Sequence, residues 1–307
     1  MLDRTSIYYR QVQLLISVLP YVAEEESFAL KGGTAINMFI RDMPRLSVDI
    51  DLAYLPIEDR DTSLTHIAEA FTRIAERVER GIRGSKVHRI GQHEDETLSK
   101  LQVERSGVRI KIETSPVMRG TLYEADTRKV SDAVEEEFGF VECQIVHMND
   151  LYAGKMCAAL DRQHPRDLFD IRNLLDNEGI DSELMNAFIV YLVSSNQSIA
   201  KLLQPNFHDM REIYEQQFSG MTVSPVSLET LLQTREEFLG IIHKKMTMEH
   251  KEFLMGFKRG EPRWDLLPFE RVEYLPSVRW KMLNLDKMPP EKRAEAVAKL
   301  SKILQTG

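Results

Sequence analysis

Cysteine is scarce in this chain: Cys143 and Cys157 are the only two among 307 residues. Two thiols cannot build a disulfide framework or, alone, a tetrahedral zinc site, and their spacing is not that of a Cys-x-x-Cys motif. Long apolar runs are also missing, because the longest uncharged stretch, residues 184–200, contains several Asn, Ser and Gln residues. We therefore expect no membrane-spanning helix. No export signal is readable, which favours a reduced, cytoplasmic protein.

An excess of basic residues is likewise absent. The chain carries 40 Lys and Arg against 48 Asp and Glu, a formal net charge of −8. Most of this imbalance lies in the first 150 residues, which hold 19 basic against 26 acidic side chains. Such a charge argues against strong non-specific binding of polyanions. Any nucleic acid must be held locally, by basic residues of the nearly neutral second half such as Lys244, Lys245, Lys258 and Arg259, whose alternative is an ordinary solvated face.

The remaining composition is typical of a soluble globular protein, with 43% apolar and 29% charged residues. The length suits about two domains. Strand patterns are concentrated in the first half, and helical repeats dominate the second. We predict an α+β fold, with a core domain over residues 1–148, built on a mixed sheet flanked by helices, and an all-helical C-terminal domain over residues 149–307.

The spacing of apolar residues predicts the individual elements. Helices are expected over residues 4–19, 35–41, 63–82, 150–162, 166–177, 183–193, 227–256 and 290–304. Strands are expected over residues 28–30, 48–52, 98–105, 108–113 and 140–146. The third and fourth of these strands read as a hairpin joined by a Ser106-Gly107 turn.

Two carboxylates alternate with apolar residues in the strand 48–52, which places Asp49 and Asp51 on the same side. Carboxylates this close repel each other unless a cation lies between them, and hard cations such as Mg²⁺ prefer carboxylate oxygens. Glu113 is the acid on the polar face of the strand 108–113 and becomes a third ligand if the two strands are neighbours. The alternative is simple solvent exposure of both aspartates.

A glycine-rich turn, Gly32-Gly33-Thr34, follows a short apolar strand and leads directly into a helix. Backbone N–H groups and the positive end of a helix favour an anion there, and glycine lets a phosphate approach the backbone itself. The alternative is a plain helix-starting turn. The combination of this turn with an Asp-x-Asp strand and a later acid is more specific than either motif alone.

A second block carries a lysine and two aspartates. Lys155 lies among small residues of a predicted helix, where a ligand could come close, and an ammonium there could act as a point charge on triphosphate oxygens; the alternative is a solvated surface lysine. Asp167 and Asp170 lie three residues apart on the next helix. One of them could accept a proton from an incoming hydroxyl or orient it, while the other pairs with Arg162 or Arg166.

These motifs together resemble the nucleotidyltransferases of the DNA polymerase β type, whose signature is Gly-Gly/Ser, a spacer, Asp-x-Asp and a later carboxylate. The spacer here, 14 residues between Thr34 and Asp49, is slightly long. The segment 45–52 and the block 150–171 narrow the likeness to the AbiEii/AbiGii toxin family of type IV toxin–antitoxin systems. The motifs cover residues 28–175, and the rest of the chain resembles the family only in its general sequence pattern.

The resemblance implies transfer of a nucleoside monophosphate from an NTP to an acceptor hydroxyl, with release of pyrophosphate. The implied metal ligands for one or two Mg²⁺ ions, or Mn²⁺, are Asp49, Asp51 and Glu113. The implied nucleotide contacts are Gly32, Gly33, Thr34, Arg45, Ser47 and Lys155, and the implied catalytic residues are Asp49, Asp51, Lys155, Asp167 and Asp170. The implied acceptor is RNA, the tRNA acceptor end being the best-known target, and a protein antitoxin neutralises the toxin.

Two alternatives share the same motifs. A small-molecule nucleotidyltransferase of the antibiotic-modifying kind would use the same nucleotide site with a closed acceptor pocket. A catalytically inactive module would retain the fold only to bind a partner, but the intact set of Asp49, Asp51, Glu113 and Lys155 favours an active enzyme.

Overall fold

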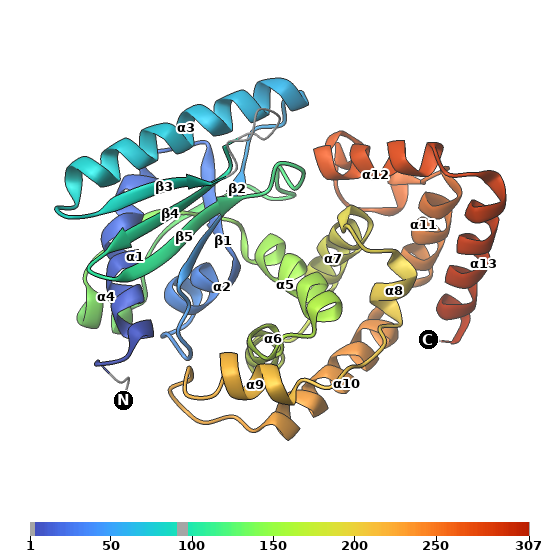
Figure 1. Cartoon of the computed structure of the whole chain (residues 1–307). Coiled ribbons are helices and arrows are strands. Elements are labelled where there is room, and N and C mark those ends of the chain that lie inside the picture. The colour runs from blue at the N-terminus through green and yellow to red at the C-terminus, as the bar shows by residue number, and fades with distance from the viewer. Residues whose placement is uncertain (1–3, 91–97, 307) are drawn as a thin grey trace. The chain divides into compact units, whose positions relative to one another are not determined.

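A seven-stranded mixed sheet forms the centre of the first half of the chain (Figure 1). The computed structural model describes residues 4–90 and 98–306. The strands are β1 Phe28–Lys31, β2 Asp49–Tyr54, β3 Lys86–Ile90, β4 Lys100–Arg105, β5 Val108–Thr114, β6 Asp126–Lys129 and β7 Glu142–Ile145. Their order across the sheet is β3-β4-β5-β2-β1-β7-β6. β2 pairs in parallel with β5, and β1 pairs in parallel with β7, whereas the other neighbours are antiparallel.

Helices pack against the apolar face of this sheet. They are α1 Ile7–Ala23 and α3 Arg60–Gly81, and the short helix α4 Asp132–Phe138 contacts α1. The short helix α2 Gly32–Ala35 continues into the π-helical turn η1 Ile36–Ile40. β5 shows why the sheet has two unlike faces: Val108, Ile110 and Ile112 are buried, whereas Arg109 and Lys111 between them are exposed. The alternation of the sequence is therefore reproduced residue by residue.

The regular elements of the second half of the chain are helices throughout its described residues. They are α5 Met148–Arg162, α6 Pro165–Asn177, α7 Ser182–Ser194, α8 Ile199–Leu203, α9 Arg211–Gln217, α10 Leu228–Lys245, α11 Met248–Arg259, η2 Trp264–Leu266, η3 Val272–Tyr274, α12 Pro276–Asp286 and α13 Pro290–Thr306. Within residues 4–90 and 98–306, none of the helices is long and apolar enough to cross a membrane.

Two compact units result, and their division does not follow the chain order completely. Unit 1 comprises Met1–His147 together with Gly220–Pro225, and unit 2 comprises Met148–Ser219 and Val226–Gly307. The small inserted segment forms a β-bridge with the residues just before β2. The Leu46 N–H donates to the Met221 carbonyl (2.9 Å), and the Val223 N–H donates to the Pro44 carbonyl (2.9 Å).

The predicted α+β fold with a mixed sheet and a helical second half is confirmed, with corrections to single elements. The one helix predicted over residues 227–256 is wrong: it is two helices, because Thr247 starts α11 with a capping box formed with His250. The first helix continues through Pro20 to Ala23 instead of ending before it. β3, β6 and α4 were not predicted, since charged edge strands and short helices carry weak periodic signals.

Candidate active site

The two aspartates of the Asp-x-Asp motif lie on β2, in the middle of the sheet. Both side chains are half-buried. In the register of the sheet, Asp51 lies opposite Glu113 of β5 on one side and opposite Lys31 of β1 on the other. The strands of Asp51 and Glu113 are thus neighbours, which is the condition under which the sequence made Glu113 a third ligand. A row of charged side chains therefore crosses the polar face of the sheet, with the carboxylates of Asp51 and Glu113 side by side in it.

Glu113 also has a cationic partner. Lys100 of β4 is its antiparallel neighbour, and the Lys100 Nζ lies 3.3 Å from the Glu113 Oε2. Both side chains are partly exposed, so this ion pair is weak and can be exchanged for another cation.

A divalent cation fits the donor set at this place. No group of three His, Cys, Asp or Glu side chains is arranged to hold a metal ion in the described part of the chain. Asp49 and Asp51 nevertheless supply two carboxylates at alternate positions of one strand. Mg²⁺ is often bound by one or two carboxylates, and waters and substrate phosphates complete its coordination. The pair is therefore suited to an ion that binds together with a nucleotide.

The glycine turn packs directly against these residues. Gly32 has a φ of +74°, and a Cβ at this position would collide with the carboxylate of Asp51. A Cβ at Gly33 would lie 2.7 Å from Nη2 of Arg45 and 3.0 Å from Oγ of Ser47. Both glycines are thus required by the close approach of the segment 45–51. The turn and the Asp-x-Asp strand form one structural unit.

Hydroxyl groups fasten this turn to the start of β2. The buried Thr34 hydroxyl donates to the backbone carbonyl of Asp49 (2.5 Å) and lies 3.0 Å from the hydroxyl of Ser47. The Arg45 guanidinium is also buried, and its Nη1 donates to the carbonyl of Leu46 (2.9 Å). In this arrangement Thr34, Ser47 and Arg45 hold the backbone of the site in place.

The second predicted group lies in unit 2, between α5 and α6. The Lys155 Nζ is 2.8 Å from Oδ1 of Asp167 and 2.9 Å from Oδ2 of Asp170, and all three side chains are buried. Arg162 extends the network from the surface, with its Nη2 2.9 Å from Oδ2 of Asp167. The sequence predicted that one of these aspartates pairs with Arg162 or Arg166, and the structure pairs Asp167 with Arg162.

The predicted residues thus form two groups, one in each unit. Unit 1 contains Gly32, Gly33, Thr34, Arg45, Ser47, Asp49, Asp51 and Glu113, and unit 2 contains Lys155, Asp167 and Asp170. A glycine turn against an Asp-x-Asp strand with a carboxylate opposite is the arrangement expected of a nucleotidyltransferase. A family model described as nucleotidyl transferase AbiEii toxin of type IV toxin–antitoxin systems matches residues 13–282. The chain belongs to the AbiEii family of nucleotidyltransferase toxins.

A solved structure gives a further comparison for this AbiEii-family protein. MenT4, a nucleotidyltransferase toxin from Mycobacterium tuberculosis H37Rv, is 13% identical, and the match covers 98% of this chain and 91% of that chain with a TM-score of 0.47. No curated protein matches the chain.

Three features of this candidate site were not found from the sequence. Lys100 could have been found, because the two-residue turn at Ser106-Gly107 fixes the hairpin register and places Lys100 opposite Glu113. Lys31 could not, because its neighbour in the sheet depends on long-range pairing. The bridge from Met221 to Leu46 carries no local signal either.

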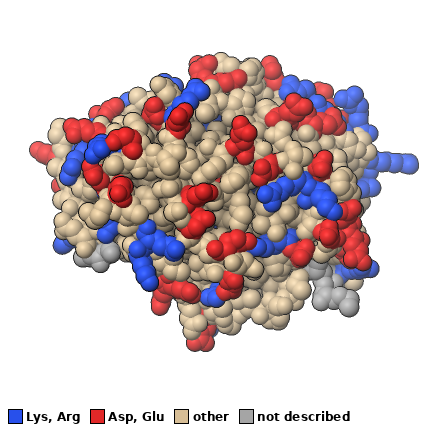
Figure 2. All heavy atoms as spheres, turned by 180° about the vertical axis from the view of Figure 1, so that it is seen from behind, with Lys and Arg blue, Asp and Glu red and all other residues tan. Residues whose placement is uncertain are grey.

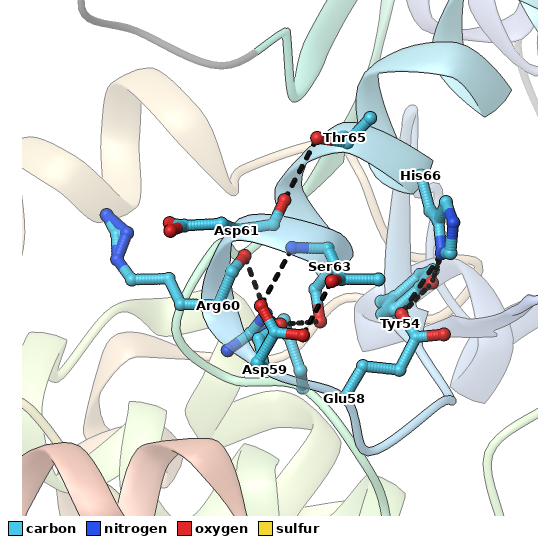
Figure 3. Close-up of polar contacts among 10 residues, drawn as sticks. Tyr54, Glu58, Asp59, Arg60, Asp61, Ser63, Thr65 and His66 are labelled. Carbon is cyan, nitrogen blue, oxygen red and sulfur yellow. Dashed lines mark hydrogen bonds and ion pairs between the residues drawn. The ribbon is translucent and has the colours of Figure 1, made fainter.

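A polar cluster anchors the far end of β2 (Figure 3). The Tyr54 hydroxyl donates to Oε2 of Glu58 (2.9 Å), and Nδ1 of His66 lies 3.1 Å from the same oxygen. Burial, followed by the hydrogen bond to Glu58, raises the pKa of Tyr54 well above its ordinary value. Asp59 caps α3 by accepting from the Thr62 N–H (3.0 Å). Both ends of the Asp-x-Asp strand are therefore tied to neighbouring elements.

Proposed function

We propose that this AbiEii-family protein transfers a nucleoside monophosphate from an NTP to a hydroxyl of an RNA acceptor, releases pyrophosphate, and is neutralised by a protein antitoxin. Family membership supports the nucleotidyltransferase class. The observation that carries the proposal is the contact between the glycine turn and the Asp-x-Asp strand: Gly32 has no room for a side chain because the carboxylate of Asp51 lies against it. A phosphate chain bound along that turn would lie beside the metal-binding carboxylates.

Asp49 and Asp51 hold the divalent cation in this proposal, and Glu113 supports them from β5. A Mg²⁺ or Mn²⁺ ion bound there would neutralise charge on the phosphates and on the leaving pyrophosphate and would lower the pKa of the attacking hydroxyl. The displacement of Glu113 from Lys100 is inexpensive, because the ion pair is exposed.

The chain's own residues position the reactants. Gly32 and Gly33 let the phosphates approach the backbone at the start of α2, where N–H groups point toward the ligand. Thr34 and Ser47 keep that backbone fixed relative to Asp49 through their hydrogen bonds. Catalysis of this kind depends mainly on positioning and charge, and a rigid turn serves both.

Unit 2 contains the other residues to which we assign a role, in its buried network. Lys155 provides a cation for triphosphate oxygens, and either Asp167 or Asp170 receives the proton of the acceptor hydroxyl or orients that hydroxyl. The Lys155 ammonium lies between both carboxylates, so it also fixes their orientation.

The test is an acceptor comparison with purified protein. Each NTP, labelled on the α-phosphate, is incubated with Mg²⁺ and either total cellular RNA or a set of hydroxyl-bearing small molecules, including aminoglycosides. We expect label in RNA, none in the small molecules, and loss of labelling with a chelator or in the Asp49→Asn variant. Labelling of a small molecule instead of RNA would show that the acceptor is not RNA. No labelling under any condition would contradict the proposed transfer.

A further inference from the structure

Three basic side chains meet in unit 2 where the ends of several helices come together. They are Lys258 in the last turn of α11, Lys281 on α12 and Arg293 on α13. Each is half-buried. Among the described residues none of the three forms an ion pair with a carboxylate.

Two of these cations have structural partners. Arg293 donates to the carbonyls of Arg259 and Leu285, near the ends of α11 and α12. Lys281 donates to the carbonyls of Ser195 and Gln197, just after α7. A cation at the C-terminal end of a helix is favourable, because the last carbonyls have no partner within the helix. These bonds explain the positions of Arg293 and Lys281.

Lys258 has no such explanation. Its ammonium makes no hydrogen bond or ion pair within residues 4–90 and 98–306. Burial, followed by the charge of Arg293, lowers its pKa, and burial, followed by the charge of Lys258, lowers the pKa of Lys281 to about 8. A half-buried ammonium beside two like charges is unfavourable in the free protein. The cluster is therefore ready to accept an anion with several oxygens.

Exposed apolar side chains lie on α12 and just before it, close to Lys281 in the sequence. Trp280 precedes Lys281 and is 47% exposed, Leu283 follows one turn later at 53%, and Tyr274 before the helix is 51% exposed. Proteins that bind single-stranded nucleic acid combine cations for the backbone with aromatic rings on which unpaired bases stack. Over the face shown in Figure 2, acidic and basic side chains are interspersed, so that face carries no broad basic surface.

We propose that Lys258, Lys281 and Arg293 bind the phosphodiester backbone of single-stranded RNA and that Trp280 stacks on one of its bases. This inference rests on the proposed RNA acceptor and adds the surface that holds it. The three cations attract the phosphates of a polyanion, and a flat exposed indole is suited to a base. Of the four basic residues suggested by the sequence, Lys258 is the one that the structure places in the cluster.

The experiment measures RNA affinity of the full chain without NTP or metal. A fluorescent single-stranded RNA of about a dozen nucleotides, within the site size of such surfaces, is titrated with protein at several salt concentrations. Lys258→Gln and Trp280→Ala are the test variants, because neither residue holds a helix end. Lys299→Gln, an exposed lysine of α13 with the same charge change, is the matched control, and Trp280→Phe retains an aromatic ring.

We expect Lys258→Gln to weaken binding about five- to tenfold at low salt and to lower the slope of log affinity against log salt by about 0.7, one single-strand phosphate contact. Trp280→Ala should weaken binding about tenfold, within the range for one stacked base, and Trp280→Phe should restore most of it. Thermal unfolding of Lys258→Gln should occur at the same temperature as the wild type or higher, because a like-charge repulsion is removed.

Two results would overturn the inference: wild-type protein that does not bind the RNA, or test variants whose affinity and salt slope equal those of Lys299→Gln. The outcome is separable from the proposed function. If the protein transfers nucleotide to RNA but the test variants bind RNA as well as the wild type does, only the proposed RNA-binding surface is wrong. If the variants bind RNA more weakly but the protein transfers no nucleotide, the RNA-binding surface is supported and the proposed function is contradicted.

Discussion

Asp51 and Glu113 lie directly opposite each other on the parallel strands β2 and β5. Side chains at paired positions of neighbouring strands share one face, so two carboxylates separated by about 60 residues of chain become neighbours. Like charges directly opposite destabilise a sheet unless cations compensate them. Lys31 and Lys100 flank the pair on the adjacent strands. The sheet thus maintains a carboxylate pair whose arrangement favours a bound cation.

The Gly32 turn gives the first prediction. Gly32→Ala should lower transfer activity at least about a hundredfold, because the new methyl group displaces the carboxylate of Asp51 and small misplacements of catalytic groups are costly. Gly84→Ala is the matched control: Gly84 also has a positive φ, +80°, but nothing lies within 4 Å of its Cβ position. Both variants should lose about 1–2 kcal/mol of stability from backbone strain, and only Gly32→Ala should lose activity. Equal activities in a labelled-NTP assay would show that the turn tolerates the displacement.

The second prediction concerns the buried lysine. Lys155→Met should lower the free energy of unfolding by about 3–5 kcal/mol, because the buried carboxylates of Asp167 and Asp170 would both lose the ammonium that lies between them. Arg162→Met removes another partner of Asp167, but the Arg162 side chain is 62% exposed, so it should cost less than about 1 kcal/mol. Urea denaturation of both variants measures the difference. Similar small losses would mean that Lys155 does not hold the two carboxylates.

The third prediction is a dependence of stability on pH. Burial of Glu25 acts to raise its pKa, but hydrogen bonds and charges from Arg73 and Arg77 outweigh it, so the pKa is below the ordinary value. The stabilisation is therefore complete above the unfolded pKa of about 4.3 and is lost as the pH falls through the folded pKa. Glu25→Gln should be less stable than the wild type by about 1–2 kcal/mol at pH 7, allowing for screening of the half-exposed Arg73.

Near pH 3 the difference between the wild type and Glu25→Gln should shrink. Glu24 is the matched control, since it pairs with Arg77 but is 55% exposed. Glu24→Gln should change unfolding little at either pH. A Glu25→Gln variant whose deficit is the same at pH 3 and pH 7 would show that the carboxylate charge contributes nothing.

The fourth prediction tests the segment 220–225. Val223→Pro removes the N–H that donates to the Pro44 carbonyl, and it should loosen the residues before β2. We expect activity to fall several-fold while stability falls by no more than about 1.5 kcal/mol, the value of one hydrogen bond. Val223→Ala keeps the N–H and changes an exposed side chain, so it should behave as wild type. Full activity in Val223→Pro would make the bridge irrelevant to the site.

Local patterns were enough to predict most of unit 1. Strict alternation predicted β2 with Asp49 and Asp51 on one side, and the Ser106-Gly107 turn predicted the hairpin of β4 and β5. Both depend on short-range chemistry: a period of two and a turn in which both central residues have positive φ. Such patterns predict the local structure correctly because that structure does not depend on a distant segment of the chain.

The contacts that shape the site depend on distant segments. The partner of Asp51 on β1, the bridge from Met221 to Leu46, and the burial of Lys155 between two aspartates all follow from packing of segments far apart in sequence. The spacing of apolar residues along the sequence does not indicate such contacts. The break between α10 and α11 was missed for a different reason: Thr247 is a recognisable N-cap, but the apolar spacing continues across it.

In the proposed reaction, Asp49 and Asp51 hold the metal ion for the transfer of a nucleoside monophosphate. The most direct measurement incubates wild-type and Asp51→Asn protein with RNA, Mg²⁺ and an NTP labelled on either the α- or the γ-phosphate. We expect α-label in RNA, γ-label in pyrophosphate, and less than about a tenth of wild-type turnover for a folded Asp51→Asn, since loss of a metal ligand costs several kcal/mol of transition-state stabilisation. Transfer of the γ-label to RNA, or an Asp51→Asn variant as active as the wild type, would contradict the proposed reaction.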